Sequence, residues 1–266
     1  MKSFKKIILF VIFAFVLLSC SGTSYHKDKL SDELKSLVKK ELGIDSTVVI
    51  IQNTLYLDIE LDSVAKKQDE IKSSFDLVSE AFSAMTRVVL SSDSDIKFVI
   101  VSAYPKDKSI LFRMGQNIDD FKAFYYMRIS RDDFLSRSMI EIEGPQTAKF
   151  SIADKRDISI DEFAGRLIVS YIMNDIRSNP LFAASVSNVN LRFLKVETRT
   201  LYLSANIDII SEAREVLQLS LQQETANFLS KYEDANIRFV KVIGNKNSQI
   251  LDLSIAPIAK QGGANK

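Results

Sequence analysis

Two short motifs occur twice in this chain, in the same order and at a similar spacing. Thr54–Leu57 (TLYL) recurs at Thr200–Leu203, and Ile96–Val99 (IKFV) has a counterpart at Ile237–Val240 (IRFV). The first motif starts 42 residues before the second in one copy and 37 residues before it in the other. One match of four common strand residues can arise by chance, but two matches in one order indicate an internal duplication. The chain is therefore expected to fold as two related modules.

The hydrophobic pattern agrees with this division, because each half predicts the same order of elements: helix, two strands, long helix, two strands. In the first half the elements are expected at residues 30–42, 47–52, 55–61, 63–90, 96–104 and 109–114. In the second half they are expected at residues 159–178, 190–196, 200–208, 211–230, 236–243 and 249–255. The first long helix carries an apolar stripe at helical spacing, which is typical of a core-facing side. Its members are Ile71, Phe75, Val78, Phe82, Met85 and Val89.

Capping residues mark several of these boundaries. Ser31 is expected to cap the first helix, and Gly43 is expected to end it. Ser159 and Glu162 have the spacing of a capping box, which predicts a helix start in the second half.

The region between the two halves allows two readings. Residues 121–130 alternate like a strand, although their aromatic side chains also fit one face of a helix; the strand is favoured here. Residues 131–136 are expected to form a short helical turn. Gly144-Pro145 interrupts the pattern and indicates a connection between domains.

The predicted fold class is α+β, with two tandem small modules. In each, the helices are expected on one face of an antiparallel or mixed sheet. The expected boundaries are a signal peptide at 1–19, a lipidated cysteine and tether at 20–29, a first module with an extension at 30–143, a linker at 144–157, a second module at 158–258 and a flexible tail at 259–266.

The start of the chain reads as a secretory signal. Three lysines precede an apolar run at residues 7–18. This run is too short to cross a bilayer, which needs about 20 apolar residues, but it fits the central region of a signal peptide. An ordinary cleaved signal and an uncleaved anchor are alternatives, yet neither requires the chain's only cysteine, Cys20, at this point.

The sequence Leu17-Leu18-Ser19-Cys20 resembles the lipobox of bacterial lipoprotein precursors. The resemblance implies cleavage between Ser19 and Cys20 and a diacylglycerol on the Cys20 sulfur. Two or more acyl chains hold a protein stably on a membrane, whereas a single chain holds it reversibly. The residue after the cysteine is Ser21 rather than Asp, which favours the outer membrane, on its periplasmic face or at the cell surface.

Composition excludes some classes of partner. With 35 basic and 34 acidic residues the chain is near neutral, and loss of residues 1–19 removes only three charges, all lysines. It therefore offers no basic field for nucleic acid. An apolar fraction of 46% is typical of globular domains and too high for disorder.

The sequence offers few groups for catalysis or metal binding. The single histidine, His26, falls in the predicted tether and reads as solvated surface, so no His-dependent triad can form. No cofactor or metal site is expected, because phosphate loops and Cys/His ligand spacings are missing. Asp93 and Asp95 lie among serines, but their spacing lacks the glycine and distal Glu of a calcium loop. A polar turn between helix and strand explains them better.

Two acidic pairs and one aromatic run complete the candidates. Asp119-Asp120 and Asp132-Asp133 leave a carboxylate-dependent hydrolase open as an interpretation, but both pairs also stand where turns and helix starts use Asp. Residues 124–127 (FYYM) are the densest aromatic run. Core packing and a surface for a partner or ligand are the two readings of that run.

The order of elements from Leu30 to Met114, and again from Ile160 to Ile255, resembles envelope lipoproteins with tandem BON domains. The chain departs from that family at Asn53-Thr54 and Arg199-Thr200, where glycines are usual, and in its longer helices. No functional residue is carried over from the family.

These observations favour a non-enzymatic binding or scaffolding module anchored in the bacterial cell envelope. Its expected partners are membrane lipid, through acylated Cys20, and a protein of the envelope. A carrier or chaperone for an apolar ligand, held in a cleft between modules, is the first alternative. A carboxylate-dependent hydrolase is the second.

Overall fold

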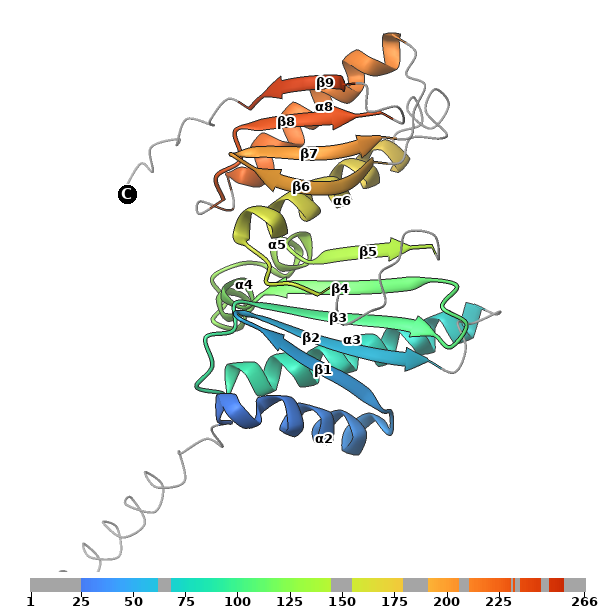
Figure 1. Ribbon diagram of the computed structural model, residues 1–266, viewed down its shortest axis with the longest axis vertical. Helices are drawn as coiled ribbons and strands as arrows, with labels where there is room; N and C mark the ends of the chain where they lie inside the picture. Colours follow the sequence, from blue (N-terminus) through green and yellow to red (C-terminus); the bar gives the residue numbers. More distant parts are fainter. Residues whose placement is uncertain are drawn as a thin grey trace, which may run out of the picture. The chain divides into compact units, whose positions relative to one another are not determined.

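The computed structural model describes residues 25–61, 68–144, 155–178, 191–205, 211–230, 232, 235–244 and 249–255. The chain forms two compact units (Figure 1). Unit 1 comprises Met1–Phe134 and Ile142–Asp157, and unit 2 comprises Leu135–Glu141 and Ile158–Lys266.

The described part of the chain up to Glu143 contains five helices, one of them a short 3-10 helix, and five strands. In chain order the elements are η1 (Lys27–Lys29), α2 (Leu30–Leu42), β1 (Ser46–Ile51), β2 (Thr54–Leu61), α3 (Gln68–Leu90), β3 (Phe98–Pro105), β4 (Leu111–Asn117), α4 (Ile118–Tyr125), α5 (Arg131–Ser136) and β5 (Met139–Glu143). The strands form one sheet in the order β1-β2-β3-β4-β5. β1 and β2 are antiparallel, β2 and β3 are parallel, and β3 and β4 are antiparallel.

Unit 2 repeats the central part of this arrangement. Its elements are α6 (Ile160–Ser178), β6 (Leu191–Glu197), β7 (Thr200–Ala205), α8 (Ser211–Leu229), β8 (Phe239–Ile243) and β9 (Gln249–Ser254). The sheet order is β6-β7-β8-β9, again with two antiparallel pairs around one parallel pair. The prediction of an α+β fold with two modules and mixed sheets is therefore confirmed.

The repeated motifs occupy the same places in the two sheets. Thr54 pairs with Phe98 in unit 1, and Thr200 pairs with Phe239 in unit 2, so each TLYL strand lies beside its own IKFV or IRFV strand in one register. The residue that precedes each TLYL strand makes the same contact. The carbonyl oxygen of Asn53 accepts hydrogen bonds from two successive amides of unit 1, and that of Arg199 accepts the equivalent two in unit 2.

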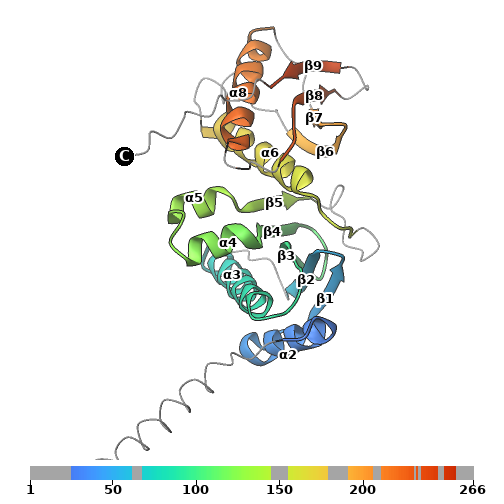
Figure 2. The same cartoon turned by 90° about the vertical axis from the view of Figure 1, so that its left-hand side faces the viewer.

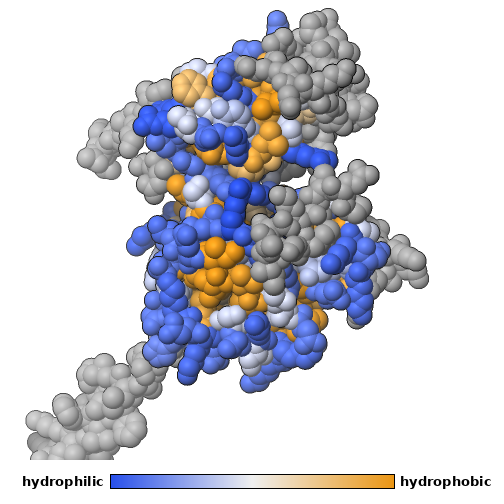
Figure 3. Space-filling model, viewed as in Figure 1, coloured by the Kyte–Doolittle hydropathy of each residue, from blue (hydrophilic) through white to orange (hydrophobic). Residues whose placement is uncertain are grey.

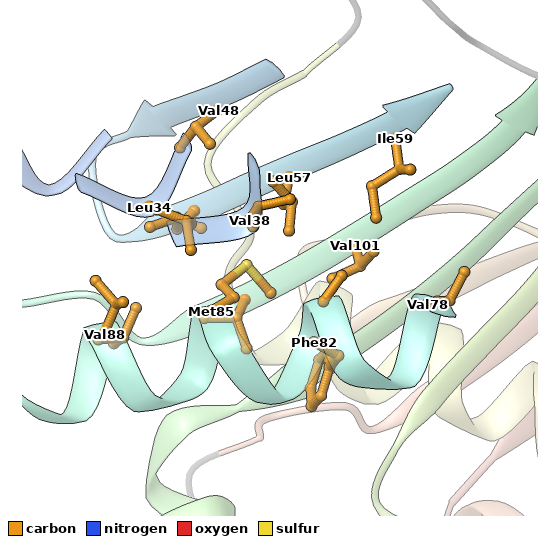
Figure 4. Packing of buried hydrophobic residues seen from close by; sticks show 14 of the residues in the cluster. Leu34, Val38, Val48, Leu57, Ile59, Val78, Phe82, Met85, Val88 and Val101 are labelled. Carbon is orange, nitrogen blue, oxygen red and sulfur yellow. The ribbon is translucent and has the colours of Figure 1, made fainter. Parts of the chain in front are cut away.

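Helices cover one face of each sheet (Figure 2). In unit 1 the alternation of β2 sends Leu57 and Ile59 to the covered side, where they are fully buried with Val101 of β3. Figure 4 shows Leu34 of α2 and Met85 of α3 in the same cluster. Burying such side chains contributes about 1.5–3 kcal/mol each, so this layer holds the helices on the sheet.

A glycine allows α6 to approach its sheet closely. A Cβ atom on Gly165 would lie 2.8 Å from Leu201 Cδ1 and 2.9 Å from Phe193 Cε2. Real side chains do not approach so closely, and the missing Cβ explains why a residue with poor helix propensity stands within α6.

The expected strand at 121–130 is wrong, because Ile118–Tyr125 is the helix α4. Asn117 caps this helix: its side chain accepts a hydrogen bond from the amide of Asp119 at 2.8 Å. Phe121 and Phe124 then share one face and meet Phe134 of α5. The spacing of Phe121 and Phe124, which also fitted one face of a helix, was therefore the correct indication of the structure here. The short helical turn expected at 131–136 is confirmed as α5.

The predicted caps are partly confirmed. Gly43 ends α2 in the left-handed conformation, with φ of 72°, and the Ser159 hydroxyl accepts a hydrogen bond from the Glu162 amide. Ser31 does not cap α2, because η1 precedes the helix and Lys29 occupies the cap position. The Ser31 hydroxyl instead donates to the carbonyl of Val48. It therefore ties α2 to the edge strand of the sheet.

Candidate binding surfaces

The predicted cleavage site between Ser19 and Cys20 and the predicted lipidation site, Cys20, lie outside the described residues. The described part begins at Tyr25, which is attached to the end of α3. The Tyr25 amide donates to the Ser91 carbonyl at 2.9 Å, and the Asp93 amide donates to the Tyr25 carbonyl at 3.2 Å. The chain that enters unit 1 is therefore fixed to one end of it.

Asp93 and Asp95 hold this attachment. One Asp93 oxygen accepts the Lys27 amide at 2.8 Å, the other lies 3.3 Å from Nδ1 of His26, and Asp95 pairs with the Lys27 ammonium. Part of the segment expected to be a tether is thus docked on unit 1. His26 itself is largely exposed, as expected for surface.

Acid is expected to release this attachment. The Lys27 amide and the His26 ring lower the pKa of Asp93, and the Lys27 ammonium lowers the pKa of Asp95. A carboxyl with a lowered pKa contributes stability above its ordinary value, 3.8 here, and loses that contribution as the pH falls further. The protection factor of the Lys27 amide, which is its exchange rate compared with the intrinsic rate at the same pH, should therefore fall below about pH 4. An exchange rate that follows only intrinsic chemistry across this range would contradict the assignment.

The acidic pairs lie at helix starts. Asp119 and Asp120 stand in the first turn of α4, where the Asp119 carboxylate accepts from Lys122 at 3.2 Å and Asp120 is buried. Ser130 caps α5: its hydroxyl accepts a hydrogen bond from the Asp133 amide at 3.0 Å and donates one to the Asp133 carboxylate at 3.3 Å. Negative charge in a first turn stabilises the helix, so each pair has a local structural role.

The aromatic run 124–127 divides between core and surface. Phe124 stacks on Phe134 with ring centroids 4.6 Å apart. Tyr125, Tyr126 and Met127 are exposed, and Met127 keeps 92% of its surface in contact with solvent. Both readings of the run are thus realised by different residues. We refer to Tyr125–Arg128 as the aromatic tip.

The backbone of the tip is held in a defined and strained shape. The Met127 amide donates to the Phe124 carbonyl at 2.9 Å, and the Arg128 amide donates to the Ala123 carbonyl at 2.7 Å, which is a Schellman ending of α4. Met127 takes the left-handed position with φ of 55°. Glycine is usual there, because a side chain costs about 1–2 kcal/mol in that conformation.

On the other face of the unit 1 sheet, away from α2 and α3, a segment of the same chain is bound. The Lys155 ammonium lies 2.7 Å from the Asp58 carboxylate and 4.8 Å from the centre of the Tyr56 ring. The Tyr56 hydroxyl donates to the Arg156 carbonyl at 2.6 Å. Lys155 and Asp58 are nearly buried, with 9% and 5% of their side chains exposed. We refer to residues 155–157 as the covering segment.

The covering segment also caps the β1–β2 turn. One oxygen of Asp157 accepts from the Asn53 amide at 3.1 Å and from the Thr54 hydroxyl at 2.9 Å. Nearby, burial and then the charges of Asp58 and Glu60 raise the pKa of Tyr104. The alternation of β2 indicated a polar side to this sheet but gave no sign of what binds there.

The equivalent face of unit 2 is exposed. Phe239 keeps 43% of its surface in contact with solvent, whereas its counterpart Phe98 keeps 3%. Lys195 lies 5.1 Å from the Tyr202 ring centre, and Lys241 pairs with Asp252 at 3.3 Å. Figure 3 shows polar and apolar residues side by side over these strands. We refer to this surface of β6–β9 as the open face.

A second ionic cluster, which sequence reasoning missed, holds unit 2 together. Arg166 donates two hydrogen bonds to Glu141, at 2.8 and 3.0 Å, and two to Glu162, at 3.1 and 3.0 Å. Its guanidinium also lies 4.8 Å from the Phe193 ring centre. Burial alone would lower the pKa of Arg166, but the two carboxylates raise it above its ordinary value. The guanidinium therefore stays charged, and its four hydrogen bonds join α6 to Glu141.

The part of the chain that the structure describes holds no group of three or more His, Cys, Asp or Glu side chains suited to a metal ion. Among the same residues, no helix combines the length and the apolarity needed to cross a bilayer. Comparison with models of known protein families and with curated proteins found no match.

Proposed function

We propose that this chain is a lipid-anchored protein of the bacterial envelope that binds a protein partner on the open face of unit 2. Acylated Cys20 would hold it on a membrane, the outer one being favoured. The binding is non-enzymatic, and the bound element is an extended segment of the partner that carries a carboxylate.

The observation that carries this proposal is the covering segment of unit 1. A short stretch without regular secondary structure lies there on the helix-free face of a sheet, held by a cation over a tyrosine ring, a buried ion pair and a capped turn. Unit 2 has the same strand order, and its central parallel pair has the same register, but its counterpart face is exposed.

The chemistry of the bound segment follows from the turn. In unit 1 the amide of Asn53 and the hydroxyl of Thr54 receive a carboxylate. Arg199 and Thr200 occupy the same places in unit 2, and Arg199 adds a positive charge beside the turn. Charge-assisted hydrogen bonds of this kind are about twice as strong as neutral ones. An acidic side chain of the partner is therefore favoured at this turn.

Crosslinking in the native cell tests the proposal. A photoreactive amino acid at Phe239 is expected to give a discrete protein adduct, whereas the same group at exposed Leu219 of α8 is not. Adding Arg199→Glu to the protein that carries the photoreactive group at Phe239 should reduce the adduct, because the new negative charge repels the partner's carboxylate. Lipid recovered at Phe239 with no protein adduct would favour the apolar-ligand carrier instead.

The anchor is tested separately by Cys20→Ala. This variant is expected to lose acyl labelling and to leave the membrane fraction. Membrane-bound, acyl-labelled protein from the variant would show that the lipobox interpretation is wrong.

A further inference from the structure

We infer that the aromatic tip of α4 rests in the headgroup region of the bilayer that carries the anchor, so that unit 1 touches the membrane at a second point. The inference rests on the proposed lipid anchor. It concerns exposed residues, because the aromatic packing beneath the tip is made by Phe124 and Phe134.

The length of chain before unit 1 brings the tip within reach of the membrane. Tyr25 is five positions after Cys20, so the two residues lie at most about 18 Å apart at 3.6 Å per residue. Tyr25 is fixed to the end of α3. Figure 1 shows that the start of α4 lies at that same end of unit 1. There the Ile118 amide donates to the carbonyl of Lys97, in the segment that follows α3, at 2.8 Å. The tip is one short helix, about 12 Å, beyond it.

The side chains of the tip suit the boundary between water and lipid. Tyr125 and Tyr126 lie 5.7 Å apart between ring centres and are both exposed. Tyrosine is enriched at membrane interfaces, because its ring is apolar and its hydroxyl stays hydrated. The Arg128 guanidinium lies 5.6 Å from the Tyr126 ring centre. This places a phosphate-binding group at the level of the aromatic rings.

Met127 adds an independent argument. It is the most exposed large apolar residue of the described chain and also takes a left-handed backbone conformation that favours glycine. Glycine at position 127 would remove the exposed apolar side chain and would fit the left-handed backbone, so the stability of unit 1 by itself favours glycine. An apolar side chain held outward by a strained but hydrogen-bonded turn is explained if it inserts between lipid headgroups.

The chain contains no tryptophan, so a single substitution gives a unique fluorescent reporter. The acylated full-length mature protein carrying Tyr126→Trp is placed in vesicles of phosphatidylethanolamine and phosphatidylglycerol. Its emission is expected to shift to the blue and to be quenched by lipids brominated near the headgroup. The matched control is Leu219→Trp, because Leu219 and Tyr126 are each 64% exposed; its emission should not change.

A second variant separates membrane contact from folding. Met127→Gly in the Tyr126→Trp background relieves the strained turn, so thermal unfolding should occur at the same or a higher temperature. Quenching by brominated lipid should nevertheless fall. Reduced quenching in a protein that is at least as stable cannot be attributed to misfolding.

Two results would overturn the inference. One is emission from Tyr126→Trp that is as unshifted and unquenched as that of the Leu219→Trp control. The other is a blue shift that requires an added envelope protein and is absent with lipid alone, which would assign the tip to a protein partner. Mass spectrometry of the same sample reports acylation of Cys20, so failure of the anchor is read independently of failure of the tip.

Discussion

Arg166→Ala is expected to destabilise unit 2 by about 3–5 kcal/mol, because it leaves two mostly buried carboxylates without their cation. Only 16% of the Glu141 side chain and 12% of the Glu162 side chain are exposed. The guanidinium supplies four hydrogen bonds to these groups and also contacts Phe193. A charge removed from water and left unpaired costs far more than the net contribution of the intact pair.

Urea denaturation, with hydrogen exchange of peptides from α6, measures this change. Lys122→Ala is the matched control, because it breaks an exposed ion pair with Asp119 that should contribute less than about 1 kcal/mol. Arg166→Met combined with Glu141→Gln and Glu162→Gln removes all three charges and is expected to recover much of the loss. An Arg166→Ala protein as stable as the Lys122→Ala control would refute the structural role of the cluster.

Lys155→Ala is expected to destabilise unit 1 by a similar amount, about 3–5 kcal/mol, and to weaken the binding of the covering segment. Asp58 is 5% exposed and would remain as an unpaired buried carboxylate. The ring of Tyr56 would lose the cation above it. Amides of the β1–β2 turn, which Asp157 caps, should then exchange faster with solvent.

The double variant Lys155→Met with Asp58→Asn distinguishes charge from shape. It keeps the side-chain volume but leaves no buried charge, so its free energy of unfolding should lie much closer to wild type than that of Lys155→Ala. Equal losses in the single and double variants would mean that the segment is held by other contacts. In that case the parallel between the covering segment and the open face would weaken, and with it the proposed partner chemistry.

Much of the fold could be predicted because its signals are local. The TLYL strands alternate with a period of two residues, and α3 repeats its apolar positions every three or four residues, so type and order of elements follow from neighbours in sequence. The region around α4 was predicted wrongly because a short aromatic run fits both periods. Its conformation was decided by the Asn117 cap and by packing on Phe134.

The candidate surfaces were harder to predict from the sequence, because the residues that form them are far apart in the chain. Lys155 meets Asp58 across 97 positions, and Arg166 meets Glu141 across 25. The sequence singled out residues 124–127, yet only the structure separates half-buried Phe124, stacked on Phe134, from exposed Met127. Asp93 and Asp95 were recognised as turn residues, but not as the groups that hold the incoming chain.

The sequence by itself determined the α+β class, the two modules and their order of elements, since each depends on periodicity or on adjacent residues. The signal peptide and the lipidation of Cys20 stay predictions from adjacent residues. The tertiary structure alone decided what occupies the helix-free face of each sheet. Alternation of side chains states that a strand has two different sides, but not whether the second side meets water or another segment. That choice depends on contacts between distant residues, which leave one sheet covered by its own chain and the other open.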